Sequence, residues 1–209
     1  MLMDQAEDGV VLISFGTVSN ISQIFPNIND NLINVLKKFP QITFLLNYDT
    51  ANDFITDIPN VISKNWISQK DLLVHENLQA LITCCDSNTI MEAVHFGVPL
   101  ICIPFSAEQM RNSRVVKRAE IAIIIERLAV TEENLVNALN SIIHSNKYKM
   151  RADRIARMIR DKPLSARESL VVQVEYAIKF GPFEIFDFAY NDLYIYQYYL
   201  LDIIIPIAL

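Results

Sequence analysis

Short apolar runs alternate with helical segments along the first part of the chain, and this alternation constrains the fold more than any other feature. Continuous apolar runs are typical of strands that a sheet buries on both faces. They occur at residues 10–16, 42–47, 60–66, 80–85, 98–104 and 121–125. Segments with helical spacing lie between them, at 28–39, 71–75, 88–96 and 107–119. Because strands alternate with helices, we predict an α/β fold built on a parallel sheet.

The pattern changes after the last of these strands, where helices follow one another. Helices are predicted from Thr131, over 148–160 and over 163–180. Residues 183–209 are aromatic and then aliphatic. Since no long linker interrupts the chain, we predict one domain over residues 1–182 and a tail over 183–209.

The tail allows two interpretations. A membrane span needs about 20 apolar residues, and only Ile203–Leu209 runs without interruption. Tyrosines clustered before an apolar run are typical of a membrane interface. The tail therefore either docks on the domain or forms the start of a possible membrane anchor. The N-terminus is acidic and shows no signal-peptide pattern.

Composition argues against several classes of function. The chain has 209 residues and a net charge of −6 without a clustered basic face, so we predict no nucleic-acid partner. The basic run at 154–160 is interpreted as the solvated face of a helix. Three cysteines, two of them adjacent, form a poor disulfide framework. We expect Cys84, Cys85 and Cys102 to be small buried apolar residues, and no spacing typical of a metal site occurs.

Motifs of nucleophilic catalysis and of glycine-rich phosphate binding are absent from the sequence. GxSxG, the P-loop and GxGxxG do not occur. His75 and His95 lie on predicted helices rather than at strand ends, so we assign neither a catalytic role.

Polar residues gather where predicted strands end, which is where open parallel sheets bind ligands. They follow four strands: Gly16 to Asn20, then Trp66, Ser68 and Gln69, then Asp86, Ser87 and Asn88, and then Ser106, Glu108 and Gln109. We predict a crevice for a small ligand at this edge, with ordinary polar loops as the alternative. Trp66 could stack on a planar ring or anchor the core.

Two of these groups stand at predicted helix starts. At Ser87 and Asn88, free N–H groups and the helix dipole favour an anion. Glu92, one turn later, could accept hydrogen bonds from a diol or face solvent. Glu108 and Gln109 could bind sugar hydroxyls, or simply place suitable side chains at a helix N-terminus.

Four motifs resemble the donor-binding signature of the UDP-glycosyltransferases, in particular the glucuronosyltransferase-like group. They are W-x-x-Q at 66–69, N-x-x-x-E-A at 88–93, FGVPLICIP at 96–104 and EQMRN at 108–112. In addition, SFGT at 14–17 resembles the first phosphate loop of that family, and YYLLDI at 198–203 resembles the segment before its membrane helix. The resemblance implies the Rossmann-like C-terminal lobe of a GT-B glycosyltransferase, which binds the donor.

The resemblance also implies roles for the nucleoside and sugar contacts. Trp66 would stack on uracil, Gln69 would contact the nucleoside, and Glu92 would hold the ribose hydroxyls. Glu108 and Gln109 would bind the transferred sugar. The family usually has Asp where this chain has Glu108, which is one methylene longer.

The diphosphate, by the same resemblance, would lie near Ser14, Thr17, Ser87 and Asn88. The turn before Ser87 departs from the family, whose pattern is His-Gly-Gly where this chain has Cys84-Cys85-Asp86. The turn therefore lacks a phosphate-contacting histidine and two glycines. Asp86 adds a negative charge where the anion would bind, although it could equally serve as a helix N-cap. We expect donor binding to be weakened by several factors of ten.

The implied activity is transfer of a hexose or glucuronate from UDP to a hydroxyl of a small lipophilic acceptor, without a metal or other cofactor. The resemblance also implies the lumenal side of the endoplasmic reticulum membrane and a possible homo-oligomer. The catalytic base and acceptor pocket of the family belong to its N-terminal half, so we assign no catalytic residue here and expect the chain alone to be inactive. The alternatives are a non-catalytic nucleotide-binding or dimerisation module and an unrelated nucleotide-binding α/β domain.

Overall fold

The structure is a computed structural model that describes residues 3–4, 6, 8–15, 26–47, 58–64, 68–181 and 193–208. The chain divides into two compact units, Met1–Asp161 and Lys162–Leu209, and each is described by itself. The predicted boundary at residue 182 stays a prediction.

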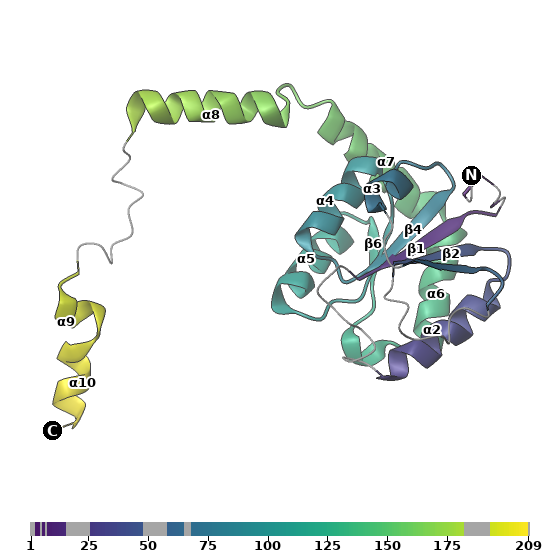
Figure 1. The fold of residues 1–209 in the computed structure, drawn as a ribbon, viewed down its shortest axis with the longest axis horizontal. Helices are drawn as coiled ribbons and strands as arrows, with labels where there is room; N and C mark the ends of the chain where they lie inside the picture. Colours follow the sequence, from purple (N-terminus) through teal and green to yellow (C-terminus); the bar gives the residue numbers. More distant parts are fainter. Residues whose placement is uncertain are drawn as a thin grey trace. The chain divides into compact units, whose positions relative to one another are not determined.

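The first unit is built on a six-stranded sheet in the order β3-β2-β1-β4-β5-β6 (Figure 1). Its strands are β1 (Val10–Ser14), β2 (Thr43–Asn47), β3 (Val61–Lys64), β4 (Leu78–Thr83), β5 (Leu100–Cys102) and β6 (Ala122–Ile124). All neighbouring strands run parallel. The predicted α/β fold is confirmed, and each predicted strand is present with its bounds shifted by one or two residues.

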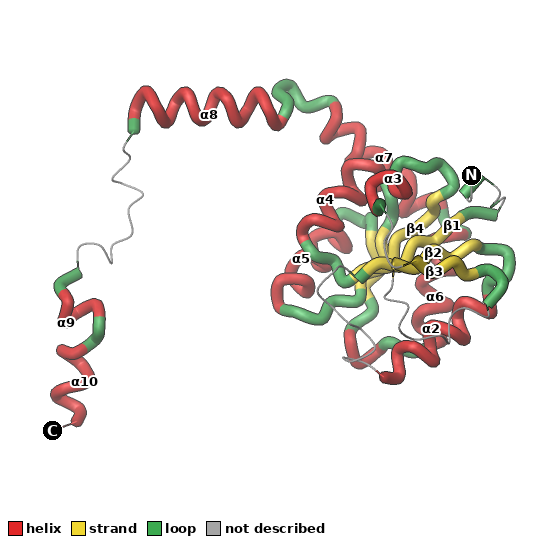
Figure 2. The backbone as a smooth tube through the Cα atoms, viewed as in Figure 1, coloured by secondary structure: helices red, strands yellow, loops and turns green. Residues whose placement is uncertain are grey.

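Helices cover both faces of the sheet (Figure 2). One face carries α2 (Pro26–Lys38) and α6 (Glu132–Ile143), which pack on the buried side chains of Val11 and Ile13. The other face carries α3 (Gln69–Leu73), α4 (Ser87–Phe96), α5 (Ala107–Arg118) and α7 (Asn146–Arg160). Burial on both faces explains why the strands read as continuous apolar runs.

The strand order reverses between β1 and β4. The chain adds β2 and β3 on one side of β1, and then returns to add β4, β5 and β6 on the other side. In open parallel sheets, the carboxyl ends of the strands at such a reversal flank the ligand crevice. The segments that follow β1 and β4 are therefore the first place to look for a site.

Helix α4, which begins at this edge, ends at Gly97 as predicted. Gly97 has φ 71, in the left-handed region that favours glycine. A Cβ atom at this position would lie 2.6 Å from Oδ1 of Asp153 in α7. Glycine here therefore both ends α4 and allows α7 to pack closely against it.

The expectation that no cysteine is paired is wrong for two of the three cysteines. Cys85 and Cys102 form a disulfide, with their Cα atoms 5.6 Å apart. The number and adjacency of the cysteines failed as a guide, because Cys85 follows the end of β4 in a left-handed conformation, with φ 65. Cys102 ends the neighbouring strand, opposite Thr83. Cys84 is free and buried, as expected.

The second unit contains α8 (Ala166–Phe180), α9 (Ile195–Tyr198) and α10 (Leu201–Ala208). Helix α8 begins with the predicted capping box, in which Ser165 and Glu168 exchange side-chain and backbone hydrogen bonds. These hydrogen bonds hold the pKa of Glu168 below its ordinary value. Among the described helices, none is both long and apolar enough to cross a membrane.

Candidate functional site

The carboxyl edge of the sheet collects most of the predicted ligand residues. Ser14 is the last residue of β1 and is 3% exposed. Ser87 and Asn88 are the first two residues of α4, which confirms their predicted place at a helix N-terminus. Glu108 and Gln109 lie in the first turn of α5.

Two predicted ligand residues, Thr17 and Trp66, lie outside the described residues. Their predicted contacts with the diphosphate and with uracil stay predictions. The remaining two, Gln69 and Glu92, lie on α3 and α4.

The turn between β4 and α4 keeps a glycine-type backbone without a glycine. Cys85 stands in the left-handed region, at φ 65, which costs an L-residue roughly 1–2 kcal/mol. Asp86 is the N-cap of α4, because its Oδ1 accepts a hydrogen bond of 3.0 Å from the Thr89 N–H. The N-cap interpretation of Asp86 is thus confirmed, and its carboxylate lies beside the helix N-terminus.

Cys84 connects this turn to the end of β1. Cys84 is 2% exposed, and the single proton on its Sγ is shared between the Phe15 carbonyl oxygen at 3.5 Å and Asp86 Oδ2 at 3.8 Å. Burial raises the pKa of the thiol, and the negative charge of Asp86 raises it further. This chain therefore has a buried thiol at the position where the resemblance implies a phosphate-contacting histidine.

We expect Cys84 to resist alkylation in the folded chain. Burial holds its pKa above that of an ordinary thiol, so the reactive thiolate is scarce at pH 7 and increases only at alkaline pH. Iodoacetamide labelling followed by mass spectrometry, with the disulfide intact, measures the rate against pH. The same chain in urea is the control and should label at least tenfold faster, because unfolding removes the burial. Equal rates in both conditions would contradict the buried thiol.

Gln69 and Glu92 meet across two helices that are distant in sequence. Gln69 Nε2 donates to Glu92 Oε2 at 2.8 Å. Lys70 Nζ lies 3.7 Å from the other carboxylate oxygen of Glu92. These two contacts orient the Glu92 carboxylate, and the side chain keeps 26% of its surface exposed. The predicted contacts of these residues with nucleoside and ribose stay predictions.

Ser87 and Glu108 meet in the same way at the starts of α4 and α5. The Ser87 hydroxyl donates to Glu108 Oε1 at 2.8 Å. Asn112, one helical turn after Glu108, adds a hydrogen bond of 3.2 Å from its Nδ2 to the same carboxylate oxygen. The predicted diphosphate residue and the predicted sugar residue thus share one hydrogen-bond network.

Gln109 has a structural role at the start of α5. Its Oε1 accepts hydrogen bonds from the backbone N–H groups of Phe105 and Ser106, at 2.8 and 3.1 Å. Ser106 completes a capping box by accepting from the Gln109 N–H. The helix-start interpretation of Gln109 is confirmed. These contacts occupy Oε1, whereas Nε2 has no hydrogen-bond partner among the described residues.

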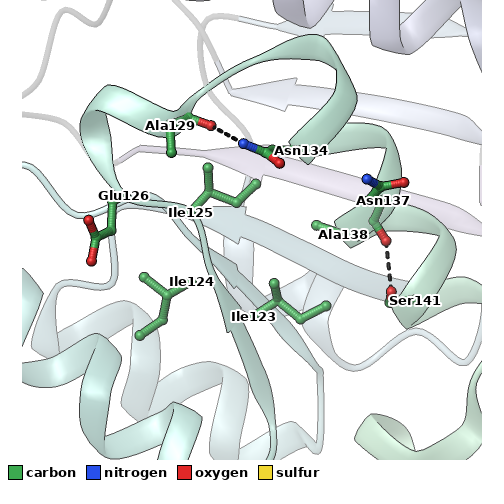
Figure 3. A pocket seen from close by; sticks show the side chains of 9 residues that line it. All are labelled: Ile123, Ile124, Ile125, Glu126, Ala129, Asn134, Asn137, Ala138 and Ser141. Carbon is green, nitrogen blue, oxygen red and sulfur yellow. Dashed lines mark hydrogen bonds between the residues drawn. The ribbon is translucent and has the colours of Figure 1, made fainter.

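A hollow of about 370 Å³ lies between β6 and α6 (Figure 3). Ile123, Ile124, Ile125, Ala129 and Ala138 supply its apolar lining, and Glu126, Asn134, Asn137 and Ser141 supply its polar lining. Asn134 and Ser141 donate to the backbone carbonyls of Ala129 and Asn137. Of the predicted ligand residues that the structure describes, none lines this hollow, so it is separate from the Ser87–Glu108 network.

The family model described as "UDP-glucoronosyl and UDP-glucosyl transferase" matches residues 2–207. The chain belongs to the UDP-glycosyltransferase family. This UDP-glycosyltransferase chain is 33% identical to ugt-46 of Caenorhabditis elegans, over 98% of the chain and 40% of that protein. It is 31% identical to UDP-glucosyltransferase 2 of Dactylopius coccus, over 97% of the chain and 39% of that protein.

A solved structure shows the same fold. UDP-glucose: anthocyanidin 3-O-glucosyltransferase, solved in complex with UDP, matches with a TM-score of 0.72 and 22% identity. The match covers 85% of this chain and 43% of that chain. The predicted Rossmann-like lobe of a GT-B glycosyltransferase is confirmed. The UDP-glycosyltransferase chain spans about 40% of the length of the curated relatives it matches.

Three residues of the site were not predicted from the sequence. Lys70 follows Gln69 directly, so its proximity to Glu92 required knowing how α3 packs on α4. Asn112 had a local signal, because it stands four residues after Glu108 and such residues share a helix face. Cys102 had no local signal, since its disulfide depends on the pairing of β4 with β5.

Proposed function

We propose that the chain is the donor-binding half of a UDP-sugar-dependent glycosyltransferase. The transferred group would be a hexose or glucuronate, and the acceptor would be a hydroxyl of a small lipophilic molecule. One observation carries the proposal: predicted donor contacts from separate helices lie in hydrogen-bonded pairs, Gln69 with Glu92 and Ser87 with Glu108. UDP in the related anthocyanidin 3-O-glucosyltransferase structure supports a UDP-linked donor.

The proposed donor follows from the chemistry of each pair. Glu92 offers carboxylate oxygens to the vicinal hydroxyls of ribose, and its orientation is fixed by Gln69 and Lys70. The N-terminus of α4 offers N–H groups and the positive end of the helix dipole to the diphosphate. The Glu108 carboxylate can accept a hydrogen bond from a sugar hydroxyl, and the amide hydrogens of Gln109 can donate one. No metal or other cofactor is required by this proposal.

Asp86 opposes the diphosphate that the α4 N-terminus would otherwise attract. Two unit negative charges 4 Å apart repel by about 1 kcal/mol in water and by about 4 kcal/mol at an effective dielectric constant of 20. Its capping of α4 keeps this carboxylate close to the helix N-terminus. The chain should therefore bind a UDP-sugar weakly.

The location and assembly of the protein follow from the family resemblance alone. We propose the lumenal side of the endoplasmic reticulum membrane, with residues 183–209 leading to an anchor, and a possible homo-oligomer. Protease protection of the protein in microsomes tests the location, since a cytosolic protein would be digested without detergent.

A non-catalytic nucleotide-binding or dimerisation module is the second candidate. The turn favours it, because Cys84 stands where the family has a histidine, and the disulfide-bonded Cys85 and Asp86 stand where it has two glycines. The two candidates differ in turnover by the full-length protein, whereas both allow nucleotide binding.

We expect the 209-residue chain, purified alone, to bind UDP with a dissociation constant in the millimolar range and to transfer no sugar. Weak binding reflects the roughly 1–4 kcal/mol of repulsion from Asp86. The catalytic base of the family belongs to the half that this sequence does not match. Ligand-observed NMR measures UDP binding, with CMP as the matched control, and radiolabelled UDP-glucose and UDP-glucuronate measure transfer. Turnover, or no preference for UDP over CMP, would contradict the proposal.

A further inference from the structure

We propose that Asn112 is a positioning residue that orients the Glu108 carboxylate for the donor sugar. Asn112 also links this carboxylate to the Cys84-Cys85-Asp86 turn. This inference rests on the proposed function. Asn112 lies in α5 and is half-buried, whereas Glu108 and Ser87 are exposed. A half-buried amide beneath two exposed polar side chains is placed to fix them in space.

The hydrogen bonds of Asn112 converge from three directions. Its Nδ2 lies 3.2 Å from Glu108 Oε1, 3.2 Å from Ser87 Oγ and 3.4 Å from the Cys85 carbonyl oxygen. An amide nitrogen carries two hydrogens. One hydrogen can serve the Cys85 carbonyl, and the other is shared between Ser87 and Glu108. Asn112 thereby joins the turn after β4, the start of α4 and the start of α5.

The consequence for Glu108 is that one carboxylate oxygen is held and the other is available. Oε1 accepts from both Ser87 and Asn112. Among the described residues, Oε2 of Glu108 has no hydrogen-bond partner. An ionised carboxylate only accepts hydrogen bonds, so Oε2 offers an acceptor to a sugar hydroxyl. Fixing the side chain in advance removes the rotamer entropy that an unrestrained glutamate would lose on binding.

The consequence for Ser87 is that its only hydroxyl proton is already used. Ser87 donates that proton to Glu108, so it cannot donate to a phosphate oxygen at the same time. In this network Ser87 supports Glu108, which accepts a hydrogen bond from the donor sugar. The phosphate contacts of this turn then come from the N–H groups of α4. The network therefore affects affinity for the sugar more than affinity for UDP.

The test compares UDP with UDP-glucose as ligands of the 209-residue chain, by saturation-transfer NMR titration, which measures weak affinities. Asn112→Ala should weaken UDP-glucose binding about tenfold, as expected for a lost hydrogen bond to a charged group, and UDP binding less than twofold. Glu108→Ala should show the same selective loss. In the double variant the loss should equal that of Glu108→Ala alone, because Asn112 acts through Glu108.

Matched variants separate positioning from a general structural role. Arg111→Ala removes the preceding exposed side chain of α5 and should leave both affinities unchanged. Asn112→Gln keeps the amide donor and should recover part of the sugar affinity. Thermal unfolding checks that each variant is folded. If Asn112→Ala does not fold, the isosteric Asn112→Asp, which removes the donor and adds a like charge beside Glu108, should lose at least as much sugar affinity.

Each outcome either supports or overturns the inference. Equal losses of UDP and UDP-glucose binding in Asn112→Ala would make Asn112 a purely structural contact. A selective loss in Glu108→Ala without one in Asn112→Ala would overturn the positioning role and leave the proposed function intact. If the unaltered chain binds neither UDP nor UDP-glucose, the proposed function fails and this inference fails with it.

Discussion

The combined substitution Cys84→His, Cys85→Gly and Asp86→Gly is expected to raise the affinity of the chain for UDP at least tenfold. Removing the Asp86 charge relieves about 1–4 kcal/mol of repulsion against the diphosphate. A histidine that hydrogen-bonds a charged phosphate adds about 1.5–3 kcal/mol. Glycine suits the left-handed backbone that Cys85 already adopts. Isothermal titration calorimetry with UDP measures the change.

The structure also shows what this substitution costs. Glycine in place of Asp86 still caps α4 with a loss of only a few tenths of a kcal/mol. Loss of the Cys85–Cys102 disulfide removes a cross-link between residues 17 positions apart. Such a disulfide typically contributes about 2–4 kcal/mol to the free energy of unfolding. The melting temperature of each variant must therefore stay above the titration temperature.

Two single substitutions separate the effect of the Asp86 charge on UDP affinity from the effect of the backbone conformation at Cys85. Asp86→Ser replaces the capping carboxylate by a capping hydroxyl and removes the charge. It should therefore give a large share of the gain in UDP affinity. Cys85→Gly removes the disulfide without changing the charge, and it should leave UDP affinity within about twofold because the backbone already has the glycine conformation. Unchanged UDP affinity in the triple variant would show that the turn does not limit donor binding.

Leu81→Ala is expected to lower the free energy of unfolding of the sheet unit by about 2–5 kcal/mol, the range for truncating a buried leucine. Leu81 is 0% exposed and lies in β4 between Leu12 of β1 and Leu100 of β5. Helices α4, α5 and α7 cover this face of the sheet, so the cavity cannot fill easily. Urea unfolding followed by circular dichroism measures the change.

Leu128→Ala is the matched control, because it makes the same truncation where Leu128 is 97% exposed, in the 3-10 turn after β6. It should change the free energy of unfolding by less than about 0.5 kcal/mol. Similar losses in both variants would contradict the assignment of Leu81 to the core. Weaker UDP binding in folded Leu81→Ala protein would further indicate that the crevice depends on rigid packing of β4.

The site could be predicted from the sequence as a set of residues, but less well as a set of contacts. Ser87 and Asn88 were placed at a helix N-terminus because capping residues and strand ends are local signals. Asp86 carried two interpretations, and the hydrogen bond to Thr89 confirmed the N-cap. For Gln109, only the position of its side chain showed that the helix start uses Oε1 and leaves Nε2 for a ligand.

By itself, the sequence determined the alternating strands and helices, the helix caps at Thr131, Ser165 and Gly97, and the motifs of the UDP-glycosyltransferase family. These features depend on residues within a few positions of one another, where periodicity and backbone preference act. Only the tertiary structure decided the Cys85–Cys102 disulfide and the contacts of Asn112. Both depend on how neighbouring strands and helices pack, because residues far apart in the chain bond only when the sheet brings their backbones together.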